Sequence, residues 1–467
     1  MAEQERRKQR EKLARRVSGY IDAGEKKSLT VLLNKQRSSD IAEITEVLDH
    51  KQRRAIFDVL DKDLAAECLE KVTEATRREL FEIFSNVELV ALFSHLDLDD
   101  VADLLSELPE DQRWGVLTKI APADSVLIKK LISYPEDSAG GIMDPVVLSV
   151  YEDATVAEAI EKIRAAEFDE DFYSVYVVNK TGTFIGDVRI RLLLTRPVET
   201  RISKLADINT IYVLAEDDQE RVRNIFSKND LIVVPVLNDN HKLIGRITAD
   251  RIIEVAEEEA AEDMYAMAGT EPEELEKFSA LHAARIRLTW LLPCLIGTGI
   301  TALVLMFFSG QFGMRNLSLV YTAAFAFVPM IAAISGNAGL QTSTIVISGL
   351  ATGHLAALKL RQVFTREIRI ALLVAMTCGV LGGLACGMLL DSQSAPEAEF
   401  FMRITFAFGV AMFSAIMVAT TLGLFLPFLF RRIGIDPAIS SGPLVTTAND
   451  SLSVLIYMTL ILALAAW

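Results

Sequence analysis

The chain has 467 residues, enough for several domains, and a formal net charge of −16. The charge is unevenly divided, because residues 1–282 carry 57 acidic and 37 basic residues whereas residues 283–467 carry 6 and 10. This division predicts an acidic soluble part followed by an apolar membrane part. The acidic balance argues against nucleic acid as a partner and favours cations.

Several other classes of protein are not expected. The first residues are charged and lack an apolar stretch, so we expect no signal peptide. The cysteines at 68, 294, 378 and 386 are scattered, which indicates neither a disulfide framework nor a zinc site. The sequence offers no nucleophile–base pair, phosphate-binding loop or histidine-rich metal site, so we do not expect an enzyme.

Residues 1–137 are expected to form an all-α N-terminal domain that begins with a charged helix over 1–28. The segment 40–48 is repeated at 100–108, with apolar residues at helical spacing, which is typical of a small helical solenoid. Acidic residues crowd the start of one helix, where the helix dipole favours them. The alternative is that they bind a cation: Asp97, Asp99, Asp100 and Asp103.

Two α/β units are expected next, at 138–200 and 201–255. The segment 176–186 is repeated at 235–245, and each copy is a strand, a polar turn and a second strand. With a helix before each copy, the duplicated β-α-β-β-α pattern resembles a CBS domain pair, whose usual opening resembles residues 142–145. Such pairs often bind adenine nucleotides through Thr and Asp three residues apart. Here Thr248 and Asp250 are two apart, which weakens the case for nucleotide binding.

A linking helix is predicted over residues 250–285. Many of its acidic residues lie four positions apart, where like charges repel and destabilise a helix. The ordinary interpretation is a solvated acidic face, and the alternative is a sensor in which a divalent cation removes the repulsion. The acidic residues are Asp250, Glu254, Glu257, Glu258, Glu259, Glu262 and Asp263.

Five apolar stretches predict a transmembrane domain over residues 286–467. Each is long enough to cross a bilayer, which needs about 20 apolar residues, and the segment 339–355 either extends the second helix or re-enters the membrane. Basic loops follow the second and fourth helices and an acidic loop follows the third, which places the N-terminal domains in the cytoplasm of a multi-pass cell-membrane protein. The five helices are expected at 288–308, 317–338, 368–390, 404–430 and 443–467.

One carboxylate lies inside the last apolar stretch. Asp450 is ~10 Å from the start of its helix, where an ionised side chain is costly and usually functional. Hydroxyl and amide groups surround it in sequence: Thr446, Thr447, Asn449 and Ser453. An inorganic cation is the natural partner, and the alternative is a structural ion pair with Arg403, Arg431 or Arg432.

The second membrane helix carries a polar stripe. Asn337, Gln341, Thr344 and Ser348 fall at i, i+4, i+7 and i+11, on one helical face. This stripe forms either a pore wall opposite Asp450 or a set of hydrogen bonds between helices.

Three stretches together resemble the MgtE family of magnesium channels: 336–341 (GNAGLQ), 434–450 and 257–263. The resemblance extends over nearly the whole chain and implies a homodimer with a pore on its axis, in which Asp450 selects Mg²⁺ during uptake. It also implies a connecting plug helix and cytoplasmic Mg²⁺ sites that close the channel. By matched position these sites include Asp99, Asp103, Asp250, Asp436, Glu257, Glu258, Glu259, Glu262 and Asp263.

The chemistry of the ion is consistent with a channel. Mg²⁺ dehydrates reluctantly, and one aspartate from each of two subunits can hold the hydrated ion through its waters. A carrier coupled to Na⁺ or H⁺ and a membrane-anchored cation sensor are the alternatives. Selectivity among Mg²⁺, Co²⁺ and Mn²⁺ stays open at this point.

Overall fold

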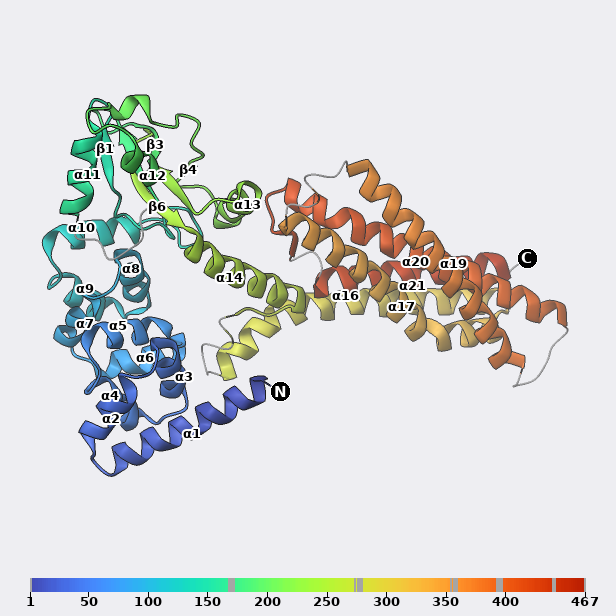
Figure 1. Cartoon of the computed structure of the whole chain (residues 1–467). Helices are drawn as coiled ribbons and strands as arrows, with labels where there is room; N and C mark the ends of the chain where they lie inside the picture. The colour runs from blue at the N-terminus through green and yellow to red at the C-terminus, as the bar shows by residue number, and fades with distance from the viewer. Residues whose placement is uncertain are drawn as a thin grey trace. The chain divides into compact units, whose positions relative to one another are not determined.

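The computed structural model describes residues 2–166, 173–272, 274, 280–352, 355, 360–391, 398–438 and 442–465. The chain divides into two compact units, Met1–Glu257 and Glu258–Trp467. Helices and two small sheets make up the first unit, and long apolar helices make up the second (Figure 1). The predicted multidomain class, with a helical N-terminal part, a duplicated α/β part and a five-helix membrane part, is confirmed.

The N-terminal residues form a series of short helices, as predicted. The repeat is confirmed, because the interval from the start of α3 to the start of α8 equals that from α4 to α9 and matches the repeat in the sequence. The charged first helix ends at Asp22, earlier than expected, and Gly24 then adopts a φ of 69°. The helices are α1 (Ala2–Asp22), α2 (Lys26–Leu33), α3 (Ser38–Glu46), α4 (His50–Phe57), α5 (Lys62–Lys71), α6 (Glu74–Ile83), α7 (Asn86–Phe93), α8 (Leu98–Glu107), α9 (Glu110–Leu117) and α10 (Pro122–Leu131).

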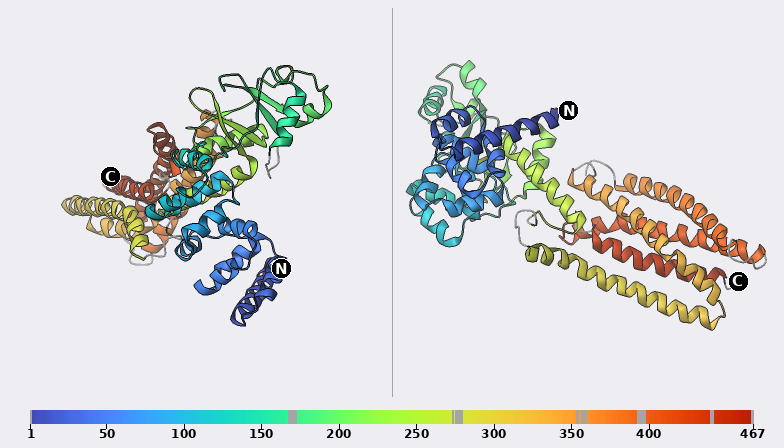
Figure 2. Two further views of the ribbon diagram at one scale, coloured as in Figure 1. Left: turned by 90° about the vertical axis from the view of Figure 1, so that its left-hand side faces the viewer. Right: turned by 90° about the horizontal axis from the view of Figure 1, so that it is seen from below.

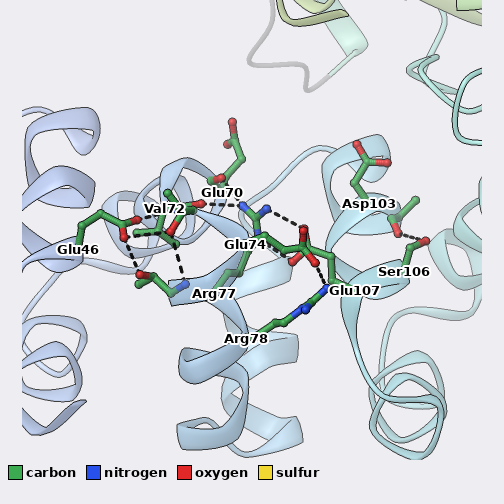
Figure 3. Close-up of polar contacts among 12 residues, drawn as sticks. Glu46, Glu70, Val72, Glu74, Arg77, Arg78, Asp103, Ser106 and Glu107 are labelled. Carbon is green, nitrogen blue, oxygen red and sulfur yellow. Dashed lines mark hydrogen bonds and ion pairs between the residues drawn. The ribbon is translucent and has the colours of Figure 1, made fainter. Parts of the chain in front are cut away.

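In each of three helical hairpins, one arginine joins the two helices. The Arg77 guanidinium on α6 donates to the Glu70 carbonyl at 2.6 Å, near the end of α5 (Figure 3). Arg53 on α4 and Arg113 on α9 bond the ends of α3 and α8 in the same way. The last carbonyls of a helix have no intrahelical partner, so each arginine satisfies one of them. Arg77 also forms two bonds of 2.6 and 2.8 Å with Glu107 on α8, which links one hairpin to the next.

The α/β part contains two copies of one three-stranded arrangement. In each, the first two strands pair in parallel and the last two pair antiparallel. The antiparallel strands of the two copies keep the spacing of the repeat in the sequence, as predicted. The first copy is β1 (Ser149–Tyr151), α11 (Val156–Ala165), β2 (Ser174–Val178), β3 (Phe184–Arg189) and α12 (Ile190–Thr195). The second, after a short 3₁₀ turn, is β4 (Val213–Leu214), α13 (Gln219–Asn229), β5 (Val233–Leu237), β6 (Leu243–Thr248) and α14 (Ala249–Ala268).

The hydrophobic core of the N-terminal helices continues into the second α/β copy. One cluster of buried residues includes Leu105 of α8, Val234 of β5 and Val255 of α14, whereas the first copy has a separate core. A buried ion pair joins the segment between α10 and β1 to the second copy, because Arg246 Nε of β6 donates to Asp144 Oδ2 at 2.8 Å. The N-terminal helices and the second α/β copy therefore share one packed interior.

The predicted linking helix is shorter than expected. α14 begins directly after β6 and ends at Ala268 rather than near residue 285. Gly269, with a φ of 74°, explains the end, because this left-handed conformation terminates helices and favours glycine. Residues 273 and 275–279 of the predicted helix lie outside the described residues.

In the described part of the second unit, five helices are long and apolar enough to cross a membrane, as predicted. They lie side by side in the right-hand view of Figure 2, and each packs against at least one other. α17 continues through Ala351, so the segment after residue 338 extends this helix up to that residue and does not re-enter. The helices are α16 (Ala280–Met314), α17 (Ser318–Ala351), α19 (Leu360–Asp391), α20 (Ala398–Arg432) and α21 (Pro443–Ala465).

Glycines allow close approach of these helices. α20 packs against α17, α19 and α21, and a Cβ added at Gly379 of α19 would lie 2.8 Å from the Gly409 carbonyl oxygen of α20. Small residues at such crossings let membrane helices pack without a hydrophobic driving force. Aromatic residues fill the rest of the interior, including Phe408 and Tyr457, whose hydroxyl donates to the Ala324 carbonyl at 3.0 Å.

We expect Arg77→Met to destabilise the N-terminal helices by about 2–4 kcal/mol, because it leaves Glu107 and two helix-end carbonyls without a partner. Arg78→Met is the matched control, since Arg78 is 40% exposed and pairs with Glu74 four residues away. That exposed pair contributes about 0.5 kcal/mol or less. Thiol labelling of the buried Cys68, followed by peptide mass spectrometry, measures local opening. Equal labelling rates in the two variants would contradict the role given to Arg77.

Candidate functional site

The polar segment of α21 packs against the glycine segment of α17. A Cβ added at Gly336 would lie 3.0 Å from Asp450 Oδ1, and one added at Gly339 would lie 2.0 Å from Asn449 Nδ2. No larger residue fits at Gly339 unless Asn449 moves. The two sequence stretches that pointed to a pore therefore lie in contact.

Polar atoms without partners gather at this contact. Both polar atoms of the Asn449 side chain, Asp450 Oδ1 and Ser453 Oγ are buried and have no hydrogen-bond partner among the residues that the structure describes. Asn449 is only 1% exposed. A buried polar atom without a partner costs about 1–3 kcal/mol, so this group of atoms is suited to bind something polar.

A purely structural role for Asp450, in an ion pair with an arginine, is not supported. Within the described part of the chain, no ion pair joins Asp450 to an arginine or lysine. Arg431 and Arg432 are exposed at the end of α20. Asp450 therefore lacks the cationic side chain that would make it a purely structural residue.

The remaining predicted pore residues divide between α17 and α21. Asn337 and Gln341 are exposed on α17, as is Ser348 farther along the same face, and Thr344 is half-buried. On α21, the Thr446 and Thr447 hydroxyls donate to backbone carbonyls one turn earlier, of Gly442 and Pro443. The stripe on α17 thus presents amide groups that nothing in the described part of one chain covers.

Asp436 lies in the exposed turn between α20 and α21. Its Oδ1 accepts a hydrogen bond of 2.8 Å from the Ala438 amide. The bond fixes the side chain within the turn and leaves the carboxylate open to solvent.

The acidic residues of α8 face α14 within the first unit. Arg251 Nη2 donates to Asp103 Oδ2 at 2.6 Å, and Arg251 Nη1 donates to Glu254 at 3.1 Å. Asp99 Oδ1 and Arg251 Nε are buried without a hydrogen-bond partner among the described residues. The carboxylates here therefore surround a guanidinium.

This crowding raises the carboxyl pKa values. Partial burial raises the pKa of Asp99 above its ordinary value, and the charge of Asp144 adds to the effect. Burial, followed by the charges of Asp99 and Glu70, raises the pKa of Asp100. Burial also raises the pKa of Asp103, against the opposing effect of Arg251. Each of these groups is held where its negative charge is unfavourable.

The predicted cytoplasmic ligands form no closed metal site in the part of the chain that the structure describes. Among the described residues, no group of three or more His, Cys, Asp or Glu side chains is arranged to hold a metal ion. Asp250 is exposed and does not join Asp99 and Asp103 in a closed site. The other predicted ligands are distributed along α14, with Glu257, Glu258 and Glu262 exposed and Glu259 and Asp263 half-buried.

The end of α14 lies next to the start of the last membrane helix. A Cβ added at Gly269 would lie 2.7 Å from Pro443 Cγ, and Trp290 of α16 is also in contact. Both glycine and proline are in the second unit, so the linking helix ends against the first residue of the helix that carries Asp450.

Sequence reasoning did not single out two residues, Arg251 and Glu367. Arg251 is the one basic residue of α14, and this isolation in an acidic helix was a signal that could have identified it. Glu367 on α19 is 3% exposed and lines a cavity of about 260 Å³ with Val346 and Gln362. Its place two turns into a membrane helix gave no comparable signal, because basic residues surround it in sequence.

Three family profiles match consecutive parts of the chain. Residues 328–460 match the MgtE profile, described as a divalent cation transporter, and residues 36–137 match the MgtE intracellular N domain. Residues 139–199 and 202–258 each match the CBS domain.

The comparisons also identify relatives of similar length. Magnesium transporter MgtE of Thermus thermophilus is 31% identical over 96% of this chain and 98% of its own, and that of Bacillus subtilis is 27% identical over 96% of both. A solved structure titled as the cytosolic domain of the Mg²⁺ channel MgtE in complex with ATP is 28% identical, with a TM-score of 0.49; the match covers 52% of this chain and 99% of that one. A relative that is 31% identical over nearly the whole of both chains shows that this chain belongs to the MgtE family of divalent cation transporters.

Proposed function

We propose that this chain is a Mg²⁺-selective channel for magnesium uptake, with its pore at the contact of α17 and α21. The observation that carries the proposal is the group of unpartnered polar atoms of Asn449, Asp450 and Ser453 inside a membrane helix. Polar and ionised groups at that depth mark ion pathways. Because Mg²⁺ tends to keep its waters, carboxylate and amide oxygens bind it here through the hydration shell.

The pore is completed by a second copy of the chain. Asn337 and Gln341 are exposed on α17, and amide groups are unfavourable against lipid tails. A homodimer around a two-fold axis covers this face and places two Asp450 carboxylates across one path. In this proposal Thr344, Thr446, Thr447 and Asn449 line the path with hydroxyl and amide groups.

The cytoplasmic part acts as a brake. We assign residues 1–137 to an N-terminal domain, 138–200 and 201–255 to CBS units, 250–285 to a plug segment and 286–467 to the pore domain. The contact of Gly269 with Pro443 gives the plug segment direct access to the pore helix. Mg²⁺ bound by acids of α14 and by Asp436 favours the closed state, and the ion's differential affinity for that state supplies the coupling.

The regulatory ions bind weakly in this scheme. The acids of α8 and α14 form no closed three-ligand site among the described residues, so waters complete the coordination of Mg²⁺. Weak, partly hydrated sites suit a sensor of millimolar magnesium. The acids assigned to it are Asp99, Asp103, Asp250, Glu257, Glu258, Glu259, Glu262 and Asp263.

A coupled carrier is the second candidate, because Glu367 is a buried carboxylate in a predicted membrane span. A carrier that exchanges a divalent cation for H⁺ or Na⁺ needs a second ionisable group besides Asp450. Flux in proteoliposomes distinguishes the two mechanisms. A channel moves Mg²⁺ at the same rate with or without a pH or Na⁺ gradient, whereas a carrier requires one.

We expect Asp450→Asn to lower Mg²⁺ flux at least tenfold, because an amide of the same shape removes the charge that attracts the hydrated cation. Thr459→Ala is the matched control, since Thr459 is exposed on the same helix and bonds its own backbone. Flux is measured in proteoliposomes after size-exclusion chromatography confirms the same oligomer. Unchanged flux in the asparagine variant would remove Asp450 from the pore.

Gly339→Ala is expected to reduce flux severalfold while the protein still folds, since the added Cβ would lie 2.0 Å from Asn449 Nδ2 and must displace that side chain. Gly299→Ala on α16 is the control, because a Cβ there meets nothing within 4 Å. The same flux assay tests both. Equal flux in the two variants would show that the position of Asn449 does not matter for transport.

For the brake, we expect Mg²⁺ to protect residues 255–285 from limited proteolysis, because bound ions offset repulsion among the acids of α14. Neutralising Asp250, Glu258 and Glu262 together should abolish this protection without affecting protection elsewhere in the chain. NaCl at equal ionic strength controls for screening. Cleavage that ignores Mg²⁺ would leave α14 as a solvated acidic helix.

A further inference from the structure

We infer that Arg251 is a tethered cation that holds α8 of the N-terminal domain against α14 of the second CBS unit without a divalent ion. The inference rests on the proposed Mg²⁺-operated brake only for its consequence, not for its geometry. Arg251 is 19% exposed and bonds one carboxylate on each helix, Asp103 at 2.6 Å and Glu254 at 3.1 Å. It therefore stands where a bridging cation would otherwise be needed.

The surroundings of Arg251 are strongly acidic. Burial disfavours the charge of Arg251, whereas the charges of Asp103, Asp99 and Glu254 favour its protonated form. The charge of Asp144 also acts on Asp99. Bringing these carboxylates together costs free energy through repulsion, and a guanidinium offsets it with directional, charge-assisted hydrogen bonds. A side chain cannot dissociate when the free Mg²⁺ concentration falls, so this compensation is permanent.

The apolar packing beneath the ion pairs agrees with a lasting contact. Leu105 of α8 and Val255 of α14 are fully buried in one hydrophobic cluster, together with Ile252. Arg251 lies next to Ile252 in sequence, at the acidic margin of this core. The two elements thus share an interior, and the arginine neutralises the charged part of the same interface.

The inference determines which part of the cytoplasmic region changes when Mg²⁺ binds. If Arg251 holds α8 against α14 at all Mg²⁺ concentrations, it takes the place of Mg²⁺ at Asp99 and Asp103, and these two residues drop out of the proposed regulatory ligands. The Mg²⁺-dependent change then takes place beyond this contact, along the later acids of α14 and the segment that follows. The N-terminal domain and the second CBS unit then move as one piece. Loss of the arginine converts this permanent contact into one that depends on Mg²⁺.

Hydrogen–deuterium exchange of the full-length protein in detergent tests the inference. In the wild type, peptides covering α8 and the first two turns of α14 should be equally protected in EDTA and in saturating MgCl₂. In Arg251→Gln, we expect about tenfold lower protection in EDTA, the effect of losing one charge-assisted contact, and recovery in MgCl₂. Arg251→Lys should keep most of the protection, because it keeps the charge.

Arg221→Gln is the matched control, since Arg221 is an exposed arginine of the same CBS unit and pairs with Asp217, just before the start of its own helix. It should leave α8 protected in EDTA. Peptides covering β5 report whether Arg251→Gln folds. If β5 also loses protection, the double variant Asp103→Asn/Arg251→Gln, which removes both charges, should regain protection of α8 in EDTA.

The inference is overturned if wild-type α8 loses protection in EDTA, if Arg251→Gln stays as protected as the wild type, or if the double variant is no better than the single one. Inhibition of wild-type flux by internal Mg²⁺ is measured separately. If internal Mg²⁺ does not inhibit flux, the proposed brake is rejected. The exchange result on Arg251 is unaffected by that outcome, so the two proposals are tested independently.

Discussion

The membrane unit is governed by one constraint, which is that a polar atom inside a bilayer needs a partner. Asn449, Asp450 and Ser453 lack one in the described part of the chain. Glycines at 336 and 339 allow α21 to approach α17 so closely that Asp450 and Asn449 lie against the glycine face of that helix, beside its polar stripe. The arrangement is stable only if an ion, water or another chain supplies the missing contacts.

In the soluble unit, the unfavourable groups are carboxylates that repel one another. Three aspartates of α8 have raised pKa values, so the fold holds them at a cost in free energy. Arginines compensate unfavourable groups throughout this unit. Arg53, Arg77 and Arg113 donate to carbonyls at helix ends, and Arg251 on α14 donates to a carboxylate of α8. A fixed guanidinium and an exchangeable divalent cation perform the same electrostatic task, and only the second responds to concentration.

Much of the fold could be predicted, because repeats and apolar runs are properties of sequence alone. Both repeats of the sequence reappear as repeated helices and repeated strands, and membership of a transporter family confirms that the chain is not an enzyme. The early end of the linking helix was missed, since Gly269 takes a left-handed conformation that the acidic periodicity does not reveal.

The site was predicted less completely. Asp450 is conspicuous in sequence because a lone carboxylate interrupts an apolar run. The contacts that make Arg251 and Glu367 notable involve residues that are distant in sequence. Arg251 pairs with Asp103, and Glu367 lines a cavity with residues of another helix. Interactions of this kind depend on tertiary packing, which no spacing within one helix encodes.

The length of α17 has a consequence for the path of the ion. Its 34 residues measure about 51 Å at 1.5 Å per residue, whereas the hydrocarbon core of a bilayer is about 30 Å thick. Tilts of membrane helices reach about 40°, which still leaves α17 too long to fit within the core. Part of the helix therefore lies outside the hydrocarbon core, and Ser348 is only three residues before its C-terminal end. Where the excess lies at this end and α17 lines the pore as proposed, a hydrated ion meets amide and hydroxyl groups before it enters the hydrocarbon core.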